Sequence, residues 1–270
     1  MLLGGLDAAV IVLGGANNLA DNGSTEGEGK DRASLTLPGH QLSLLEGAWS
    51  RAEANKVPLV VVLVDGKPTA EKILLSLPST IVAFQAGQAQ GRGIAEVILG
   101  ITNPSGKLPV SFPLSADILP VYYNYFPSST RGGWCDAQNG VIWPFGHGLS
   151  FTEFSYASLR VPTNVSKSGT LRICVDVENK GTVAGTEVVQ LYIRDVIASV
   201  NTPIKMLKGF QRVSLKPKEI QTVCMEVDVA TELRLIDRTY NWIVEDGYFN
   251  VLIGSSSDDI RLTGQFYVGP

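Results

Sequence analysis

The sequence predicts a three-layer α/β sandwich followed by an all-β sandwich with immunoglobulin-like architecture. In the first half, short apolar runs alternate with helical patterns, which is typical of a mostly parallel sheet covered on both faces. From about residue 155 the apolar period changes to two, as in strands with one buried face. A long stretch rich in aromatic residues and glycine lies between them. We therefore expect three segments, namely 1–113, 114–154 and 155–270.

The first segment alternates strands and helices. The run that ends in Gly14 and Gly15 is continuously apolar, which predicts a strand over 7–15 that is buried on both faces. Apolar residues recur at helical spacing over 41–55 and predict a helix there. The remaining elements expected are strands over 58–65 and 80–84, helices over 70–76 and 94–99, and a short edge-like strand over 107–112 that Pro109 interrupts.

The later segments are expected to differ in regularity. Residues 114–154 carry many aromatic side chains, which indicates either a connector that uses aromatic packing or a direct ligand role. Beyond them, alternating apolar residues predict strands that include 171–177, 188–193, 223–227 and 248–253. Cys174 and Cys224 fall on the polar side of their strands and are candidates for cross-strand neighbours, with a disulfide left open.

Composition and motifs exclude several functions. The formal net charge is −4 and there is no basic stripe, so nucleic acid is not an expected partner. No apolar run reaches the length of a membrane span, and the first residues lack the pattern of a signal peptide. The two histidines and three cysteines show no metal-ligand spacing, so we expect no metal. The glycine-rich turn at 85–93 lacks the phosphate-loop patterns, so we expect no nucleotide cofactor.

The loop over 24–32 is the strongest candidate for chemistry. It follows the first predicted strand, and its Glu26 and Glu28 lie among Gly23, Gly27 and Gly29, followed by Lys30, Asp31 and Arg32. Ligands of open α/β sheets bind outside the carboxyl ends of the strands, and a general acid there must reach its substrate atom. The other interpretation is a solvated acidic turn.

Five segments together resemble glycoside hydrolase family 3. The run from Glu28 to Gln41 resembles that family's E-x-x-D-R…L-x-L-P-G-x-Q signature. The segment 103–112 is similar to its N-P-S-G-[KR]-L-P-V-[ST]-F pattern, and 143–152 to its [YF]-P-F-G-x-G-L-S-Y-T pattern. Residues 179–192 and 203–210 resemble the fibronectin type III-like module that follows in the family.

The resemblance implies an incomplete enzyme. Family members carry a nucleophilic aspartate on a (β/α)8-type barrel, and no segment here matches that barrel. The 1–113 segment resembles the family's C-terminal α/β sandwich domain and 155–270 its fibronectin type III-like domain. A chain with this content is a fragment, or a gene product without its first domain, whose possible partner is the missing N-terminal barrel. We expect this chain alone to be inactive.

The resemblance also implies roles for the loop residues. Glu28 matches the acid/base of a retaining glycosidase, and Glu26 is the alternative because many members have an E-x-E pair in this loop. Asp31 and Arg32 are expected to brace the loop, Lys30 to be solvated, and His147 to be structural. The substrate class implied is a plant cell-wall oligosaccharide cleaved at its non-reducing end, with a β-xylosidase or α-arabinofuranosidase favoured and a β-glucosidase open. The full-length enzyme would act outside the cell.

A different class of function stays open. The chain is alternatively a non-catalytic carbohydrate-binding or interaction protein that kept its fold after losing the barrel. If the surface where the lost barrel docked is apolar and exposed, that would favour the non-catalytic function.

Overall fold

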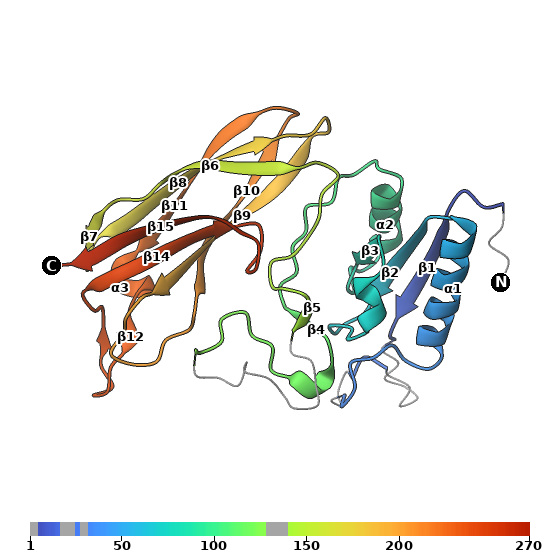
Figure 1. The fold of residues 1–270 in the computed structure, drawn as a ribbon, viewed down its shortest axis with the longest axis horizontal. Coiled ribbons are helices and arrows are strands. Elements are labelled where there is room, and N and C mark those ends of the chain that lie inside the picture. The colour runs from blue at the N-terminus through green and yellow to red at the C-terminus, as the bar shows by residue number, and fades with distance from the viewer. Residues whose placement is uncertain (1–4, 17–24, 28–31, 128–139) are drawn as a thin grey trace. The chain divides into compact units, whose positions relative to one another are not determined.

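A computed structural model describes residues 5–16, 25–27, 32–127 and 140–270 (Figure 1). It contains two compact units. The first comprises the described parts of 1–102, 111–121 and 133–143, and the second those of 103–110, 122–132 and 144–270. The segment boundaries after residues 113 and 154 stay predictions.

The first unit is built on a parallel sheet in the order β1-β2-β3 (Figure 1). The register pairs Ile11 with Val61 and Val62 with Ile81. The elements are strands β1 (Ala9–Gly14), β2 (Leu59–Val64), β3 (Thr80–Val82), β4 (Phe112–Pro113) and β5 (Val141–Trp143), helices α1 (Gln41–Asn55) and α2 (Gln90–Ile98), and 3₁₀ helices η1 (Lys72–Leu75) and η2 (Ala116–Ile118).

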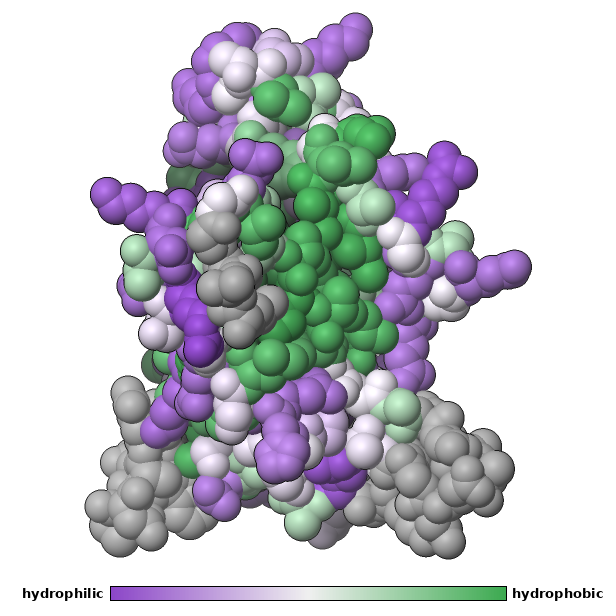
Figure 2. Space-filling model, turned by 90° about the vertical axis from the view of Figure 1, so that its right-hand side faces the viewer, coloured by the Kyte–Doolittle hydropathy of each residue, from purple (hydrophilic) through white to green (hydrophobic). Residues whose placement is uncertain are grey.

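The prediction that the first strand is buried on both faces is wrong. Ile11 and Leu13 are buried, whereas Val10 and Val12 on the opposite face are 49% and 60% exposed. The apolar run predicted the strand correctly, but it does not tell what covers each face. A face of this unit carries a broad apolar area in the space-filling view (Figure 2). Val10 and Val12 are therefore only partly covered by the described residues.

The helices differ in how well the sequence predicts their bounds. α1 occupies the predicted range 41–55 and buries Leu45, Ala48 and Ala52. α2 begins at Gln90, inside the glycine-rich turn, four residues before the predicted start. The expected helix over 70–76 is a single 3₁₀ turn, η1.

The edge-like strand expected over 107–112 is also wrong. Only Phe112 lies in a strand, the two-residue β4, which pairs with β5. Within the second unit, Leu108 instead exchanges backbone hydrogen bonds with the turn at Gly146 and His147, each 2.8 Å long. Pro109, which follows Leu108, has no N–H group to donate. It therefore interrupts a ladder of backbone hydrogen bonds at its own position.

The second unit is a β-sandwich of a five-stranded and a three-stranded sheet. The sheet orders are β10-β9-β14-β15-β7 and β11-β8-β6. The strands are β6 (Phe154–Arg160), β7 (Asn164–Ser166), β8 (Thr170–Asn179), β9 (Gly185–Asp195), β10 (Met206–Leu215), β11 (Ile220–Asp228), β14 (Gly247–Gly254) and β15 (Ile260–Gly269), accompanied by helix α3 (Val229–Glu232) and a small hairpin of β12 (Leu235–Ile236) and β13 (Trp242–Ile243).

The alternating pattern identifies the core of this sandwich. Leu171, Ile173, Val175 and Val177 of β8 are all fully buried, and residues of β9, β11, β14 and β15 join them in one cluster. The predicted fold class, an α/β sandwich followed by an immunoglobulin-like sandwich, is confirmed.

Aromatic residues of the predicted connector pack within both units. Trp143 contacts Phe112 in the first unit, with ring centroids 5.4 Å apart. In the second unit Tyr123 stacks on Phe145 at 4.4 Å and meets Tyr192 edge-on at 5.7 Å. The packing interpretation of these aromatics is therefore supported at Tyr123, Phe145 and Trp143.

Cys174 and Cys224 form a disulfide across neighbouring strands. They are directly opposite each other in the register of β8 and β11, with Cα atoms 4.1 Å apart. Fifty positions separate the two cysteines in sequence, so the bond closes a large loop. Such a bond stabilises mainly by restricting the unfolded chain.

We predict that only one of the three cysteines reacts with an alkylating reagent in denatured, unreduced protein. Removing the disulfide by the double substitution Cys174→Ser and Cys224→Ser is expected to lower the free energy of unfolding by about 2–4 kcal/mol. Mass spectrometry counts the labels, and denaturant titration measures the stability. A Cys135→Ser control should take up no label at all. Three labels on unreduced wild-type protein would contradict the pairing.

Candidate active site

The candidate site lies where β1 and β2 end. β1 ends at Gly14 and leads into the loop that contains Glu26, while β2 ends at Val64 and is followed directly by Asp65. The two strands are parallel, so both segments leave the same edge of the sheet. This is the edge at which open α/β sheets bind ligands.

The structure describes two of the four loop residues predicted to act or to brace. Glu28 and Asp31 lie outside the described residues, as does Lys30, so their roles stay predictions. Glu26 and Arg32 are described. The Arg32 guanidinium donates to the backbone carbonyl oxygens of Thr25 and, at 3.2 Å, Ser34.

Glu26 is bound to the end of β2. Its Oε2 accepts a hydrogen bond from the backbone N–H of Gly66. Its other oxygen, Oε1, is buried beside Asp65. Among the described residues, no donor reaches Glu26 Oε1 or Asp65 Oδ1 if both carboxyl groups are ionised. A proton on Glu26 removes this problem, because Glu26 then donates to Asp65.

Asp65 is the centre of a buried polar cluster. Its Oδ2 accepts from Lys67 Nζ at 2.7 Å and from the Thr69 hydroxyl at 2.6 Å. Asp65 and Lys67 are 2% and 8% exposed, so this ion pair is shielded from water. A buried charge without a partner is very costly, which makes each member necessary to the other.

The two carboxyl groups have pKa values displaced in opposite directions. Burial, followed by the hydrogen bond to Asp65, raises the pKa of Glu26. Burial also works to raise the pKa of Asp65, but hydrogen bonds with Glu26, Lys67 and Thr69 outweigh it and lower the value. Adjacent carboxyl groups share one proton in this way because both cannot ionise cheaply. The protonated form is therefore favoured at Glu26 and the ionised form at Asp65.

The segment after the loop is fastened to the same edge. The Gln41 side-chain amide exchanges two hydrogen bonds with the backbone of Gly14, both 2.8 Å long. Glu71, which is buried, accepts from the backbone N–H of Leu37 at 2.8 Å. Leu37 and Gln41 belong to the L-x-L-P-G-x-Q pattern, so this part of the motif attaches the start of α1 to the end of β1.

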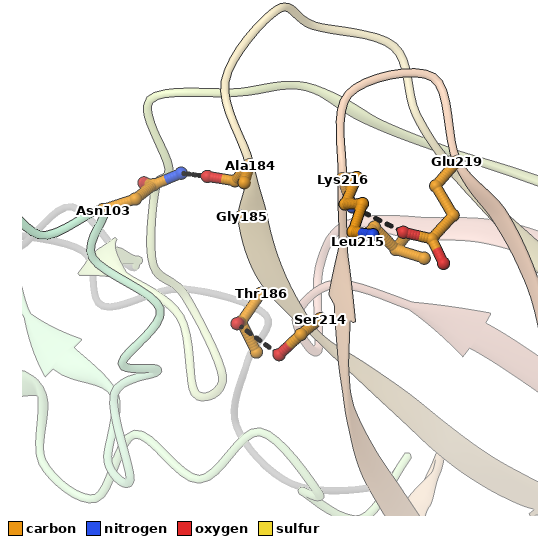
Figure 3. A pocket seen from close by; sticks show the side chains of 8 residues that line it. All are labelled: Asn103, Ala184, Gly185, Thr186, Ser214, Leu215, Lys216 and Glu219. Carbon is orange, nitrogen blue, oxygen red and sulfur yellow. Dashed lines mark hydrogen bonds between the residues drawn. The ribbon is translucent and has the colours of Figure 1, made fainter.

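The second unit holds a separate open pocket. Its volume is about 410 Å³, and it lies at one end of β9 and β10 (Figure 3). Its polar groups are already paired with one another: Asn103 donates to the Ala184 carbonyl at 2.9 Å, Thr186 bonds Ser214 at 2.8 Å, and Glu219 accepts from the Lys216 N–H at 2.7 Å (Figure 3). These hydrogen bonds hold the segments that line the pocket together, so we interpret the pocket as a structural feature of the second unit.

Two absences concern the described part of the chain. It contains no group of three or more His, Cys, Asp or Glu side chains able to hold a metal ion. None of its helices is long and apolar enough to cross a membrane. His147, expected to be structural, lies in a turn, and burial followed by the nearby Lys107 lowers its pKa.

The fold and this edge define an α/β domain with paired carboxyl groups at its ligand-binding side, followed in sequence by an immunoglobulin-like module. Comparison with protein families identifies the class further. The model of the glycosyl hydrolase family 3 C-terminal domain matches residues 4–151, and that of a fibronectin type III-like domain matches residues 187–257. The chain belongs to glycosyl hydrolase family 3.

Individual relatives agree with this assignment. The chain is 38% identical over 262 residues to a β-xylosidase of Formosa agariphila and 35% identical over 268 residues to a periplasmic β-glucosidase of Salmonella typhimurium, with 94% of the chain covered in both. A crystal structure of a β-glucosidase from Listeria innocua in complex with glucose matches with a TM-score of 0.87 and 29% identity over 98% of the chain.

The match covers only a part of these proteins. The alignments take in 35% and 34% of the two relatives and 37% of the Listeria innocua chain. The chain thus spans about a third of the length of the curated relatives it matches.

Sequence reasoning missed the partners of Glu26. Asp65 could have been found, because a carboxylate directly after a predicted buried strand lies at the ligand-binding edge. Lys67 and Thr69 follow it at alternate positions, in a segment for which the sequence predicts no role. The part played by Gly66 has no such signal, since it depends on a contact between residues 40 positions apart.

We predict that Lys67→Met lowers the free energy of unfolding by about 3–5 kcal/mol, because Asp65 would stay buried without its partner. Arg92→Met is the control: Arg92 pairs with Glu96 at 2.7 Å, but its side chain is 83% exposed. That change should cost about 0.5 kcal/mol or less. Denaturant titrations compare the two variants with wild type. Equal losses would contradict the buried ion pair.

We also predict a pH dependence specific to Glu26. A raised pKa in the folded state means that its contribution to stability is complete below the unfolded value of 4.5 and is lost as pH rises through the folded value. Glu26→Gln imitates the protonated group and removes that loss. Relative to wild type, its thermal midpoint should therefore increase between pH 4.5 and pH 8. A constant difference across this range would show that Glu26 does not titrate as described.

Proposed function

We propose that this chain is part of a retaining glycoside hydrolase that releases sugar units from the non-reducing ends of plant cell-wall oligosaccharides. The activity favoured is that of a β-xylosidase. Membership of glycosyl hydrolase family 3 carries this proposal, and a relative named as a β-xylosidase supports the choice of sugar. The β-glucosidases among the relatives support the second choice.

The proposed mechanism needs two carboxyl groups, one of which this chain supplies. Retaining glycosidases hold them about 5–5.5 Å apart across the scissile bond. Glu28 is proposed to protonate the leaving oxygen and then to activate water. The nucleophile is proposed to reside on a barrel domain outside this chain, in keeping with the third of the relatives' length that the chain spans.

Asp31 and Arg32 are proposed to brace the loop around Glu28. The contact of Arg32 with the Thr25 carbonyl supports this for Arg32, because it joins the two ends of the segment that contains Glu28. The substrate is proposed to be an oligosaccharide met outside the cytoplasm, and the periplasmic location in the name of one relative supports that setting.

A second function is favoured by one observation. Val10 and Val12 are exposed on one face of β1, as expected for a surface that binds another polypeptide. A non-catalytic carbohydrate-binding or interaction role is therefore the alternative proposal.

We predict that the chain alone does not hydrolyse aryl β-xyloside, α-arabinofuranoside or β-glucoside, because the covalent intermediate needs the missing nucleophile. Addition of a separately expressed family 3 barrel should restore turnover of at least one of them. In that mixture, Glu28→Gln should reduce kcat by about 10²–10⁴-fold.

Lys30→Gln is the matched control, since it changes a neighbouring charge without removing a carboxyl group, and it should keep most of the activity. Turnover by the chain alone would contradict the missing nucleophile. A folded chain that stays silent in the mixture would favour the non-catalytic alternative.

A further inference from the structure

Among the described residues, three sets of hydrogen bonds hold the loop that carries both glutamates. At its base, the backbone N–H of Thr25 donates to the Ala16 carbonyl at 2.9 Å, and the Ala16 N–H donates to the Thr25 hydroxyl at 2.8 Å. Arg32 donates to the Thr25 carbonyl. The third contact is the one from Glu26 to Gly66. Of these three, the last joins the loop to the segment that follows a different strand, β2.

The Glu26 carboxyl group occupies a slot that two glycines leave open. A Cβ atom built on Gly15 would lie 1.3 Å from Glu26 Oε1, and one built on Gly66 would lie 2.8 Å from Glu26 Oε2. Gly15 takes no left-handed backbone angle, so space rather than conformation requires a glycine there. Any larger residue at Gly15 would displace the carboxyl group.

Both oxygens of Glu26 lie within this slot. Oε2 accepts from Gly66, and Oε1 is buried against Asp65, whose own charge is neutralised by Lys67. A general acid must bring its proton within hydrogen-bond distance of the substrate oxygen. The carboxyl group of Glu26 instead faces Asp65 and the backbone N–H of Gly66. Glu26 is therefore badly placed for that role, while it is well placed to hold the chain.

We propose that Glu26 is a positioning residue, whose carboxyl group, seated between Gly15 and Gly66, fixes the chain two residues before Glu28. Two residues span at most about 7 Å, so fixing Glu26 limits where Glu28 can reach. The consequence for catalysis rests on the proposed function of Glu28. The seating of Glu26 does not, because it is a property of the folded first unit.

Hydrogen exchange at Gly66 tests the seating without any activity. Glu26→Ala removes the acceptor, and Gly15→Ala fills the slot, so the Gly66 amide should exchange at least tenfold faster in both variants. Glu26→Gln keeps an acceptor for Gly66 and a donor for Asp65, and should retain the wild-type rate. Gly91→Ala is the control, since a Cβ there meets nothing within 4 Å. Unchanged Gly66 exchange in folded Glu26→Ala would overturn the proposal.

The reconstituted enzyme separates positioning from acid catalysis. With the barrel added, Glu26→Gln should keep kcat within about threefold of wild type and preserve the pH profile, whereas Glu28→Gln should lose the activity. Loss of the basic limb of the profile in Glu26→Gln would overturn the proposal by making Glu26 the acid. If the mixture never becomes active while Gly66 exchange behaves as expected, the proposed function fails and the seating of Glu26 stands.

Discussion

The candidate site depends on a buried charge. Asp65, at the end of β2, is held in the interior by Lys67 and Thr69, and it presents its remaining oxygen to Glu26. The buried charge of Asp65 is tolerated because Lys67 offsets it, and the raised pKa of Glu26 favours its neutral form beside Asp65. Through Glu26 this cluster joins the loop after β1 to the neighbouring strand. The position of Glu26 in the loop therefore depends on the charges of this cluster. A substitution of Lys67 is expected to alter that position.

The neighbouring hydrogen bonds also attach segments of the chain to the ends of the strands. Gln41 attaches the first residue of α1 to Gly14, and Glu71 attaches Leu37 to the segment after β2. These side chains come from separate parts of the sequence but all converge on the carboxyl edge of the parallel sheet. The pattern L-x-L-P-G-x-Q thus has a structural explanation in this chain. Val10 and Val12 are exposed on β1, the strand that leads into the site. A polypeptide packed on that face of β1 would therefore also support the site.

Elements with strong local periodicity could be predicted from the sequence. The range 41–55 has helical spacing throughout, and β8 alternates without interruption, so both follow from local pattern alone. The second face of β1 could not be predicted, because an apolar run does not reveal what packs on it. The 107–112 segment resembled a strand, but its hydrogen bonds go to a turn that is distant in sequence. Motif register could rank Glu28 above Glu26, whereas the seat of Glu26 required Gly15 and Gly66 to be brought together by the sheet.

We propose that this chain supplies the acid/base carboxyl group of a retaining glycosidase, whereas the nucleophile resides on a barrel domain. A 2-deoxy-2-fluoro glycoside traps the covalent glycosyl-enzyme intermediate, and peptide mass spectrometry then locates the attached sugar in the enzyme reconstituted from this chain and a family 3 barrel. We expect the sugar to be attached to an aspartate of the barrel and every peptide of this chain to be unlabelled. A sugar attached to any carboxyl group of this chain would contradict it.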